Sequence, residues 1–230
     1  MDAARVQLLR ELLSTTDWLE RTSTFARALR RSTDTDKGLL LVGTPTEEPW
    51  HLAAHLDDES RYSNLPGLSP TLVRWNPPPG APAHLAVGLH RLETATRGET
   101  LFVVAPDRPP DMLLERVDDA RRIGATILSM DSGDTELEGL AHEVLVVPRQ
   151  GLIAPTDAEM LSIGLAGAGL SDLDLSSPTV SFDTVSHLVS SAAGDVAMAS
   201  AGSGSSTRRG FRDRLSRLLD IIEGPDPRKE

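Results

Sequence analysis

Five short apolar segments alternate with helical segments between residues 37 and 148, and this alternation limits the fold of the chain more than any other feature. The apolar segments cover residues 39–43, 71–75, 100–105, 126–130 and 144–148. Continuous apolar runs of this length are typical of strands that are buried on both faces. Strands that are joined through helices need crossover connections and form parallel sheets. The sequence therefore predicts an α/β fold with a doubly wound, five-stranded parallel sheet flanked by helices.

The segments between the predicted strands carry helical signals. We expect helices at residues 45–61, 84–96, 109–124 and 135–140. In the second of these, Leu85, Leu89 and Leu92 lie on one face. The third opens on two prolines and closes at Gly124, which is the usual distribution of proline and glycine at helix ends.

Further helical segments lie on both sides of the predicted sheet. Residues 158–170 and 182–193 have helical patterns, and a helix after residue 206 would place five arginines opposite an apolar stripe. The stretch SAGSGSS has the composition of a flexible linker. We divide the chain into N-terminal amphipathic helices (1–36), an α/β domain (37–199), a linker (200–206) and a basic amphipathic C-terminal helix with its tail (207–230).

Charge and composition exclude several classes of function. The chain has 34 acidic and 23 basic residues and a net charge of -11. Nucleic acid is therefore not expected as the main partner, because binding a polyphosphate needs a basic surface. The absence of cysteine removes disulfides, thiolate catalysis and cysteine-ligated zinc. No apolar stretch reaches the roughly 18 residues of a membrane span, and we expect a cytoplasmic protein.

The order and content of these elements resemble the sugar isomerase (SIS) domain family. GETLFVVAP, the helical segment ending in RRIGATILSM, and LEGLAHEVLVVP are similar to the second half of an SIS domain. KGLLLVG, WHLAAHL and PGLSPTLVRW resemble its first half as found in phosphoheptose isomerases. The resemblance implies the SIS fold, a sugar phosphate or other small anion as ligand, and a homo-oligomer, dimer or tetramer, whose sites lie between subunits.

The loops that hold phosphate in this family have a different composition here. The resemblance implies a Gly-Ser-rich turn after the first strand and a Ser-Thr-Ser-Gly type turn after the third, where hydroxyls and free amides bind the anion. The first turn reads GTPTEEP, with Thr44 and Thr46 as candidate ligand-binding residues beside Glu48. The third-strand turn reads APDRPPD and offers Asp107 and Arg108. Acidic side chains compete with phosphate and prolines remove amide donors, so we expect the usual phosphate site to be lost.

Two histidines lie four residues apart on the predicted helix 45–61. Both rings of His51 and His55 should project from one face, as in helical metal-binding pairs. The resemblance implies a metal-binding and acid–base histidine at His51, whereas His55 replaces the carboxylate of the family. His187 lies on the predicted helix that resembles the last ligand-bearing helix of the family. These three residues predict a zinc site. The alternative is two partly exposed histidines beside core leucines.

An isomerase also needs a base that moves a proton between adjacent sugar carbons. His51, His55 and Glu48 are the candidate catalytic residues, and Glu47 and Asp57 are alternatives to Glu48 that the sequence does not separate from it.

The remaining candidates have competing structural interpretations. Ser132 follows the fourth strand in a loop that could bind a ligand or form an ordinary turn. Arg108 and Arg149 could bind an anion together or pair with nearby acids. The C-terminal basic helix could contact a protein partner or the chain itself.

Three functions are compatible with the sequence. The first is an SIS-fold binding, regulatory or scaffold protein that has lost sugar-phosphate catalysis. The second is a divergent metal-dependent sugar-phosphate isomerase of the phosphoheptose type. The third is the inactive partner subunit of an isomerase hetero-oligomer. Because the phosphate loops depart from the family pattern, we predict the first.

Overall fold

The computed structural model describes residues 17–34, 37–149 and 178–201. Within these residues, five strands form one parallel sheet in the order β2-β1-β3-β4-β5. The strands are β1 (Leu39–Val42), β2 (Pro70–Val73), β3 (Thr100–Ala105), β4 (Thr126–Asp131) and β5 (Glu143–Val146). Each observed end lies within two residues of its prediction, so the predicted five-stranded parallel sheet is confirmed.

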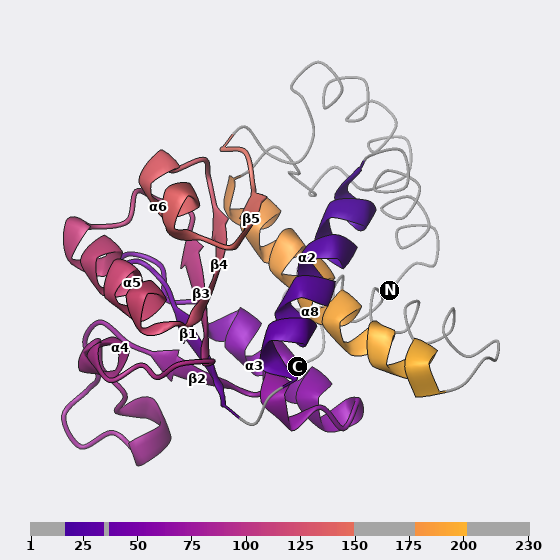
Figure 1. Ribbon diagram of the computed structural model, residues 1–230, viewed down its shortest axis with the longest axis horizontal. Helices are drawn as coiled ribbons and strands as arrows, with labels where there is room; N and C mark the ends of the chain where they lie inside the picture. The colour runs from indigo at the N-terminus through magenta and orange to yellow at the C-terminus, as the bar shows by residue number, and fades with distance from the viewer. Residues whose placement is uncertain (1–16, 35–36, 150–177, 202–230) are drawn as a thin grey trace, which may run out of the picture.

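Helices cover both faces of this sheet, as Figure 1 shows. One layer contains α2 (Trp18–Thr33), α3 (Trp50–Tyr62) and α8 (Pro178–Ala201). The other contains α4 (His90–Glu93), α5 (Asp111–Ile123) and α6 (Thr135–Leu140). Two short 3-10 helices flank β2 in the sequence: η1 (Pro66–Leu68) precedes it and η2 (Ala83–Leu85) follows it. Among the described helices, none is long and apolar enough to cross a bilayer.

Alternate residues of the strands point into two separate cores. Leu39, Leu41 and Phe102 pack toward α2, α3 and α8, whereas Leu40 and Val103 pack toward the layer that contains α5. All six residues of β3 are buried, because this strand lies in the middle of the sheet. The continuous apolar runs of the sequence are thus explained by burial on both faces.

The predicted helix at residues 84–96 is largely wrong. The structure has η2 and the four-residue α4 there, and the residues between them follow the edge of the sheet. The backbone N–H of Arg74 donates to the carbonyl of Val87 at 2.8 Å, and Arg74 and Gly88 form an isolated parallel bridge. Pairing with the end of β2 replaces the helical hydrogen bonds that the leucine spacing predicted.

Other boundaries differ by smaller amounts. α3 begins at Trp50, because residues 44–47 form a turn of their own, whereas the prediction began at residue 45. α5 ends at Ile123 and is followed by Gly124, whose φ of 102° is the left-handed conformation expected of a C-terminal glycine. α8 is longer than predicted and includes the first two residues of the proposed linker. Residues 1–16, the predicted helix 158–170 and the C-terminal basic helix lie outside the described residues.

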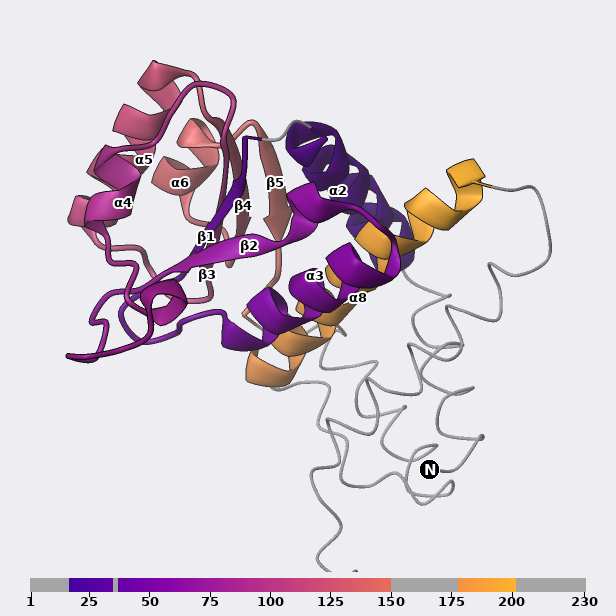
Figure 2. The same cartoon turned by 90° about the horizontal axis from the view of Figure 1, so that it is seen from below.

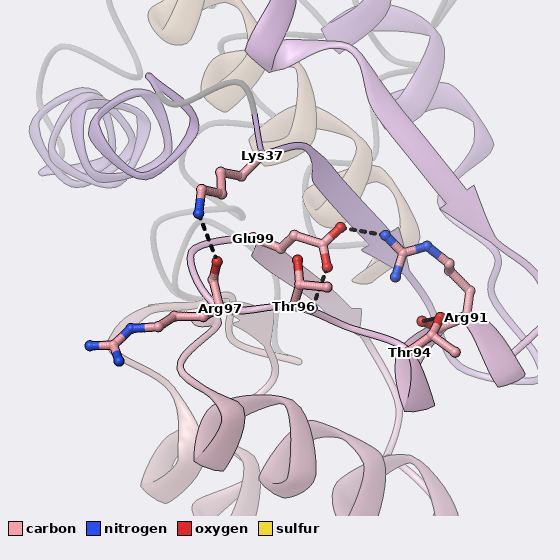
Figure 3. A network of polar contacts seen from close by, with 6 residues as sticks. All are labelled: Lys37, Arg91, Thr94, Thr96, Arg97 and Glu99. Carbon is pink, nitrogen blue, oxygen red and sulfur yellow. Dashed lines mark hydrogen bonds and ion pairs between the residues drawn. The ribbon is translucent and has the colours of Figure 1, made fainter.

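A polar network holds the turn that leads into β3 (Figure 3). The carboxylate of Glu99, which is 4% exposed, forms an ion pair with Arg91 and accepts the backbone N–H of Thr96 at 2.5 Å. Lys37 donates to the carbonyl of Arg97 at 3.3 Å and so joins this turn to the start of β1. These contacts fix the amino ends of the neighbouring strands β1 and β3 relative to each other.

α8 packs against both α2 and α3 and joins them into one layer (Figure 2). This packing buries His187, whose ring centroid lies 3.9 Å from that of His55 on α3. Burial, and to a smaller extent the neighbouring His55 and His51, lower the pKa of His187 from 6.5 to about 3. Burial also lowers the pKa of His55. His187 therefore stays neutral in the folded protein at neutral pH.

Phe102 is the aromatic residue on which the larger core depends. It is fully buried, and its ring centroid lies 5.3 Å from that of Phe25 on α2. We expect Phe102→Ala to lower the free energy of unfolding by about 3–5 kcal/mol through loss of burial and the cavity that remains. Phe102→Leu should cost less than half as much. Urea unfolding measures both values, and a loss below about 1 kcal/mol in the alanine variant would contradict this packing.

The buried histidine should make stability depend on pH. The unfolded chain protonates this side chain near pH 6.5, whereas the folded protein does so only near pH 3, so the free energy of unfolding should fall as the pH is lowered between these values. One such group contributes up to about 1.4 kcal/mol per pH unit. His187→Phe keeps a ring in this position but does not titrate, and should reduce the slope in urea unfolding series.

The exposed His84 provides the matched control for that series. His84→Phe should keep the slope of the unsubstituted protein. Equal slopes in the unsubstituted protein and in His187→Phe would show that His187 is not held neutral by burial.

Candidate functional site

A pocket of about 460 Å³ opens at the carboxyl ends of β1 and β3. These neighbouring strands are followed by α3 and α5, which lie on opposite faces of the sheet. The loops after the two strands therefore diverge and leave a crevice, the usual ligand position in doubly wound sheets. α8 supplies the remaining wall. The lining residues are Glu47, Glu48, Pro49, Trp50, His51, Leu52, Val104, Pro106, Asp107, Arg149, Phe182, Asp183 and Ser186.

The turn after β1 uses its own backbone donors. The N–H of Thr44 donates to the carbonyl of Glu47 at 3.1 Å, and the N–H of Glu47 donates back to the carbonyl of Thr44 at 3.2 Å. A Cβ atom at Gly43 would lie 2.0 Å from the carbonyl oxygen of Glu47, so only glycine allows this tight turn. The amides of Thr44 and Glu47 are thus not directed toward a ligand.

The two threonine hydroxyls of this turn bond within the protein. The hydroxyl of Thr46 donates to Asp107 Oδ2 at 3.0 Å, and the hydroxyl oxygens of Thr44 and Thr46 lie 3.1 Å apart. Asp107 follows β3, so this contact joins the two loops that border the crevice. The structure brings these three predicted ligand-binding residues together, with the carboxylate of Asp107 accepting the hydrogen bond of Thr46.

Glu48 holds the end of β2. Its carboxylate accepts Arg74 Nε at 3.0 Å and the backbone N–H of Trp75 at 3.1 Å. The indole N–H of Trp75 donates to the carbonyl of Gly43 at 2.9 Å, and the guanidinium of Arg74 lies 4.4 Å from the ring centroid of Trp50. Both oxygens of this carboxylate already accept hydrogen bonds. A structural role therefore accounts for Glu48 as well as the predicted catalytic role does.

The three predicted metal-binding histidines occupy different environments. His51 is exposed and lines the pocket, whereas His55 is half-buried and His187 is buried behind it. His55 and His187 are in ring contact, as described above. Among the residues that the structure describes, no three His, Asp or Glu side chains are arranged to hold a metal ion. The zinc site therefore stays a prediction without support from this geometry.

Asp183 is the ionisable pocket residue that the sequence analysis missed. It is half-buried on α8, and burial raises its pKa, while the nearby His51 and His55 act in the opposite direction. Burial, followed by the charges of Asp183 and Asp107, also raises the pKa of Glu47. The sequence contained a signal, because Asp183 precedes His187 by four residues, the same spacing as His51 and His55 on α3.

The other predicted residues are either connected to the pocket or lie away from it. Arg149 lines the pocket and donates from Nε to Ser132 Oγ at 3.1 Å, and Ser132 donates to the carbonyl of Pro106 at 2.8 Å. Ser132 thus positions the arginine and the turn after β3. Arg108 is exposed and does not line the pocket. Asp57 accepts Ser69 Oγ at 2.7 Å and pairs with Arg61, away from the pocket.

Comparison with known proteins gives a structural likeness only. No protein-family model and no curated protein matches the sequence. The fold is similar to the crystal structure of a candidate phosphosugar isomerase from Silicibacter pomeroyi DSS-3, with a TM-score of 0.50 and 11% identity. That match covers 96% of this chain and 55% of the other, so the chain spans little more than half the length of that protein.

Two further solved structures have lower scores. The sugar isomerase domain of an RpiR transcription factor from Sphaerobacter thermophilus has a TM-score of 0.48 and 14% identity, over 96% of this chain and 99% of the other. The Vibrio vulnificus NanR protein complexed with ManNAc-6P has a TM-score of 0.39 and 14% identity, over 90% and 65%. The strand order, the two helical layers and the first of these likenesses show that the described residues have the SIS fold.

Proposed function

We propose that this SIS-fold domain binds a small polyhydroxylated ligand without a phosphate group, and acts as a binding or regulatory protein rather than a sugar-phosphate isomerase. The main support is that the hydrogen-bond donors of the turn after β1 are already bonded within the protein. The Thr46 hydroxyl donates to Asp107, and the amides of Thr44 and Glu47 donate within their own turn. A phosphate in this turn would meet a carboxylate and occupied donors.

The charge of the pocket supports the same ligand class. Its lining contains four acidic residues, Glu47, Glu48, Asp107 and Asp183, and one arginine, Arg149. One of the acids, Glu48, is balanced by Arg74. The remaining excess of carboxylates disfavours an anion and favours a neutral sugar or, better, a protonated amino sugar. The exposed ring of Trp50 and the side chain of Phe182 offer apolar surface for the faces of such a ligand.

The second candidate function is a divergent sugar-phosphate isomerase. The observation that favours it is the position of Asp183, a half-buried carboxyl group with a raised pKa, beside the pocket residue His51. A carboxylate whose pKa is raised is a stronger base and can exchange a proton with a substrate carbon or hydroxyl. In that case His51 and Asp183 would share the acid–base steps, and Arg149 would be the available cation for an anionic substrate.

Matched ligands should separate these functions. The ligands are grouped in sets, each with a sugar, the corresponding amino sugar and the corresponding phosphate ester. Their binding is measured by calorimetry on the unsubstituted protein and on Asp107→Asn. We expect the amino sugar to bind most tightly, and Asp107→Asn to weaken it about tenfold, because a charge-assisted hydrogen bond contributes roughly 1.5 kcal/mol. The affinity of any phosphate ester should be the same in both proteins, since such an ester would not occupy this pocket.

Asp119→Asn, an exposed change on α5, is the matched control and should leave amino-sugar binding unaltered. Tighter binding of a phosphate ester to Asp107→Asn would place phosphate in the pocket and overturn the proposal. Interconversion of an aldose phosphate and a ketose phosphate that is lost in His51→Ala would establish the isomerase instead.

A further inference from the structure

A second pocket, of about 400 Å³, contains three arginines at the end of α2. α2 ends just before β1 and η1 ends just before β2, so this pocket lies at the amino ends of the strands, opposite the pocket described above. We call it the arginine pocket. Besides Arg27, Arg30 and Arg31, its lining includes Asn64, Leu65 and Pro66.

The usual role of arginines at a helix end is to satisfy the last carbonyls, and hydroxyl groups do that here. Ser32 Oγ and Thr33 Oγ1 donate to the carbonyl of Leu29 at 2.8 and 2.9 Å. Thr100 Oγ1, at the start of β3, donates to the carbonyl of Ser32 at 2.9 Å. Thr33 Oγ1 also lies 3.3 Å from the carbonyl oxygen of Arg30, so hydroxyl groups contact the carbonyls of Arg30 and Ser32 among the last four of α2. Among the described residues, no arginine of this pocket donates to a carbonyl of the helix.

Within the described residues these guanidinium groups lack acidic partners. Arg27 donates to the hydroxyl of Thr24 at 2.9 Å, and no acidic residue of the described ranges forms an ion pair with Arg27, Arg30 or Arg31. Arg30 Nη1 is buried and has no hydrogen-bond partner there. An unpaired buried donor on a charged group is costly, so a bound acceptor would stabilise it. In a chain of net charge -11, three neighbouring arginines without an acidic partner in the described part of the chain are unexpected.

The opposite wall of the arginine pocket is fixed against α2. A Cβ atom at Gly67 would lie 2.0 Å from the carbonyl oxygen of Thr33, so the backbone of η1 touches the end of α2 directly. Asn64 has a φ of 53°, and the N–H of Leu65 donates to the carbonyl of Ser60 at 2.9 Å, which holds the turn after α3. Leu65 and Pro66 add apolar surface beside the guanidinium groups.

We propose that the arginine pocket binds a small oxyanion, the phosphate group of a small phosphate ester, with Arg30 as the central ligand and Arg27 and Arg31 beside it. Planar guanidinium groups present pairs of N–H donors that match the oxygen spacing of phosphate. The neighbouring leucine and proline side chains would contact the organic part of the ester. This site is independent of the pocket at the carboxyl ends of the strands and does not rest on the function proposed for that pocket.

Calorimetric titration of the full chain with inorganic phosphate, in phosphate-free buffer at constant ionic strength, tests the site directly. We expect saturable binding of one phosphate per chain, weakened at least tenfold in Arg30→Gln and partly retained in Arg30→Lys, which keeps the charge but loses the fork of donors. Arg122→Gln, which changes an arginine paired with Asp118 on α5, should bind phosphate as the unsubstituted protein does. A small phosphate ester should then bind more tightly than phosphate alone.

Two controls keep the result unambiguous. Arg31→Gln, at an exposed residue of the pocket, should also weaken binding, so the conclusion does not depend on the folding of one variant. Absence of saturable binding, or equal binding in Arg30→Gln, would overturn the site. Binding that is lost in Arg149→Gln and retained in Arg30→Gln would place phosphate at the carboxyl ends of the strands, and would overturn both this site and the proposed function.

Discussion

A parallel sheet with apolar side chains on both faces is stable only when both faces are covered, and every functional feature of this protein depends on that cover. The layer of α2, α3 and α8 is assembled from segments far apart in the chain. Because α8 completes this layer, it brings Asp183 to the mouth of the crevice and places His187 against His55. The packing that stabilises the sheet therefore also sets the electrostatics of the pocket.

The two ends of the strands have opposite character. The carboxyl ends are bordered by Glu47, Asp107 and Asp183, whereas the amino ends are bordered by the arginines of α2. This is the reverse of what phosphate binding at the carboxyl edge would require. The likeness in fold therefore does not carry a likeness in charge, and the ligands proposed for the two ends of the sheet follow from the charge.

The strands could be predicted from the sequence because burial on both faces leaves a simple signal, a continuous apolar run such as LFVVA in β3. The segment at residues 84–96 could not, because its leucine spacing fits a helix while Arg74 and Gly88 pair as an extension of the sheet. In the same way, the sequence showed acids in the turn after β1 but not that Glu48 reaches Arg74 and Trp75, which depends on tertiary contact. Asp183 was missed because the packing of α8 on α3 cannot be derived from local patterns.

The position of Glu48 limits which substitutions the turn after β1 tolerates. Its carboxylate joins the turn after β1 to the backbone of Trp75, at the end of an edge strand. An exchange of this glutamate for the serine that a phosphate-binding turn would use removes a negative charge but also releases that strand end. A serine at this position would thus leave Arg74 and the N–H of Trp75 without their acceptor. The residue at this position is thus constrained by the stability of the sheet edge as much as by any ligand of the pocket.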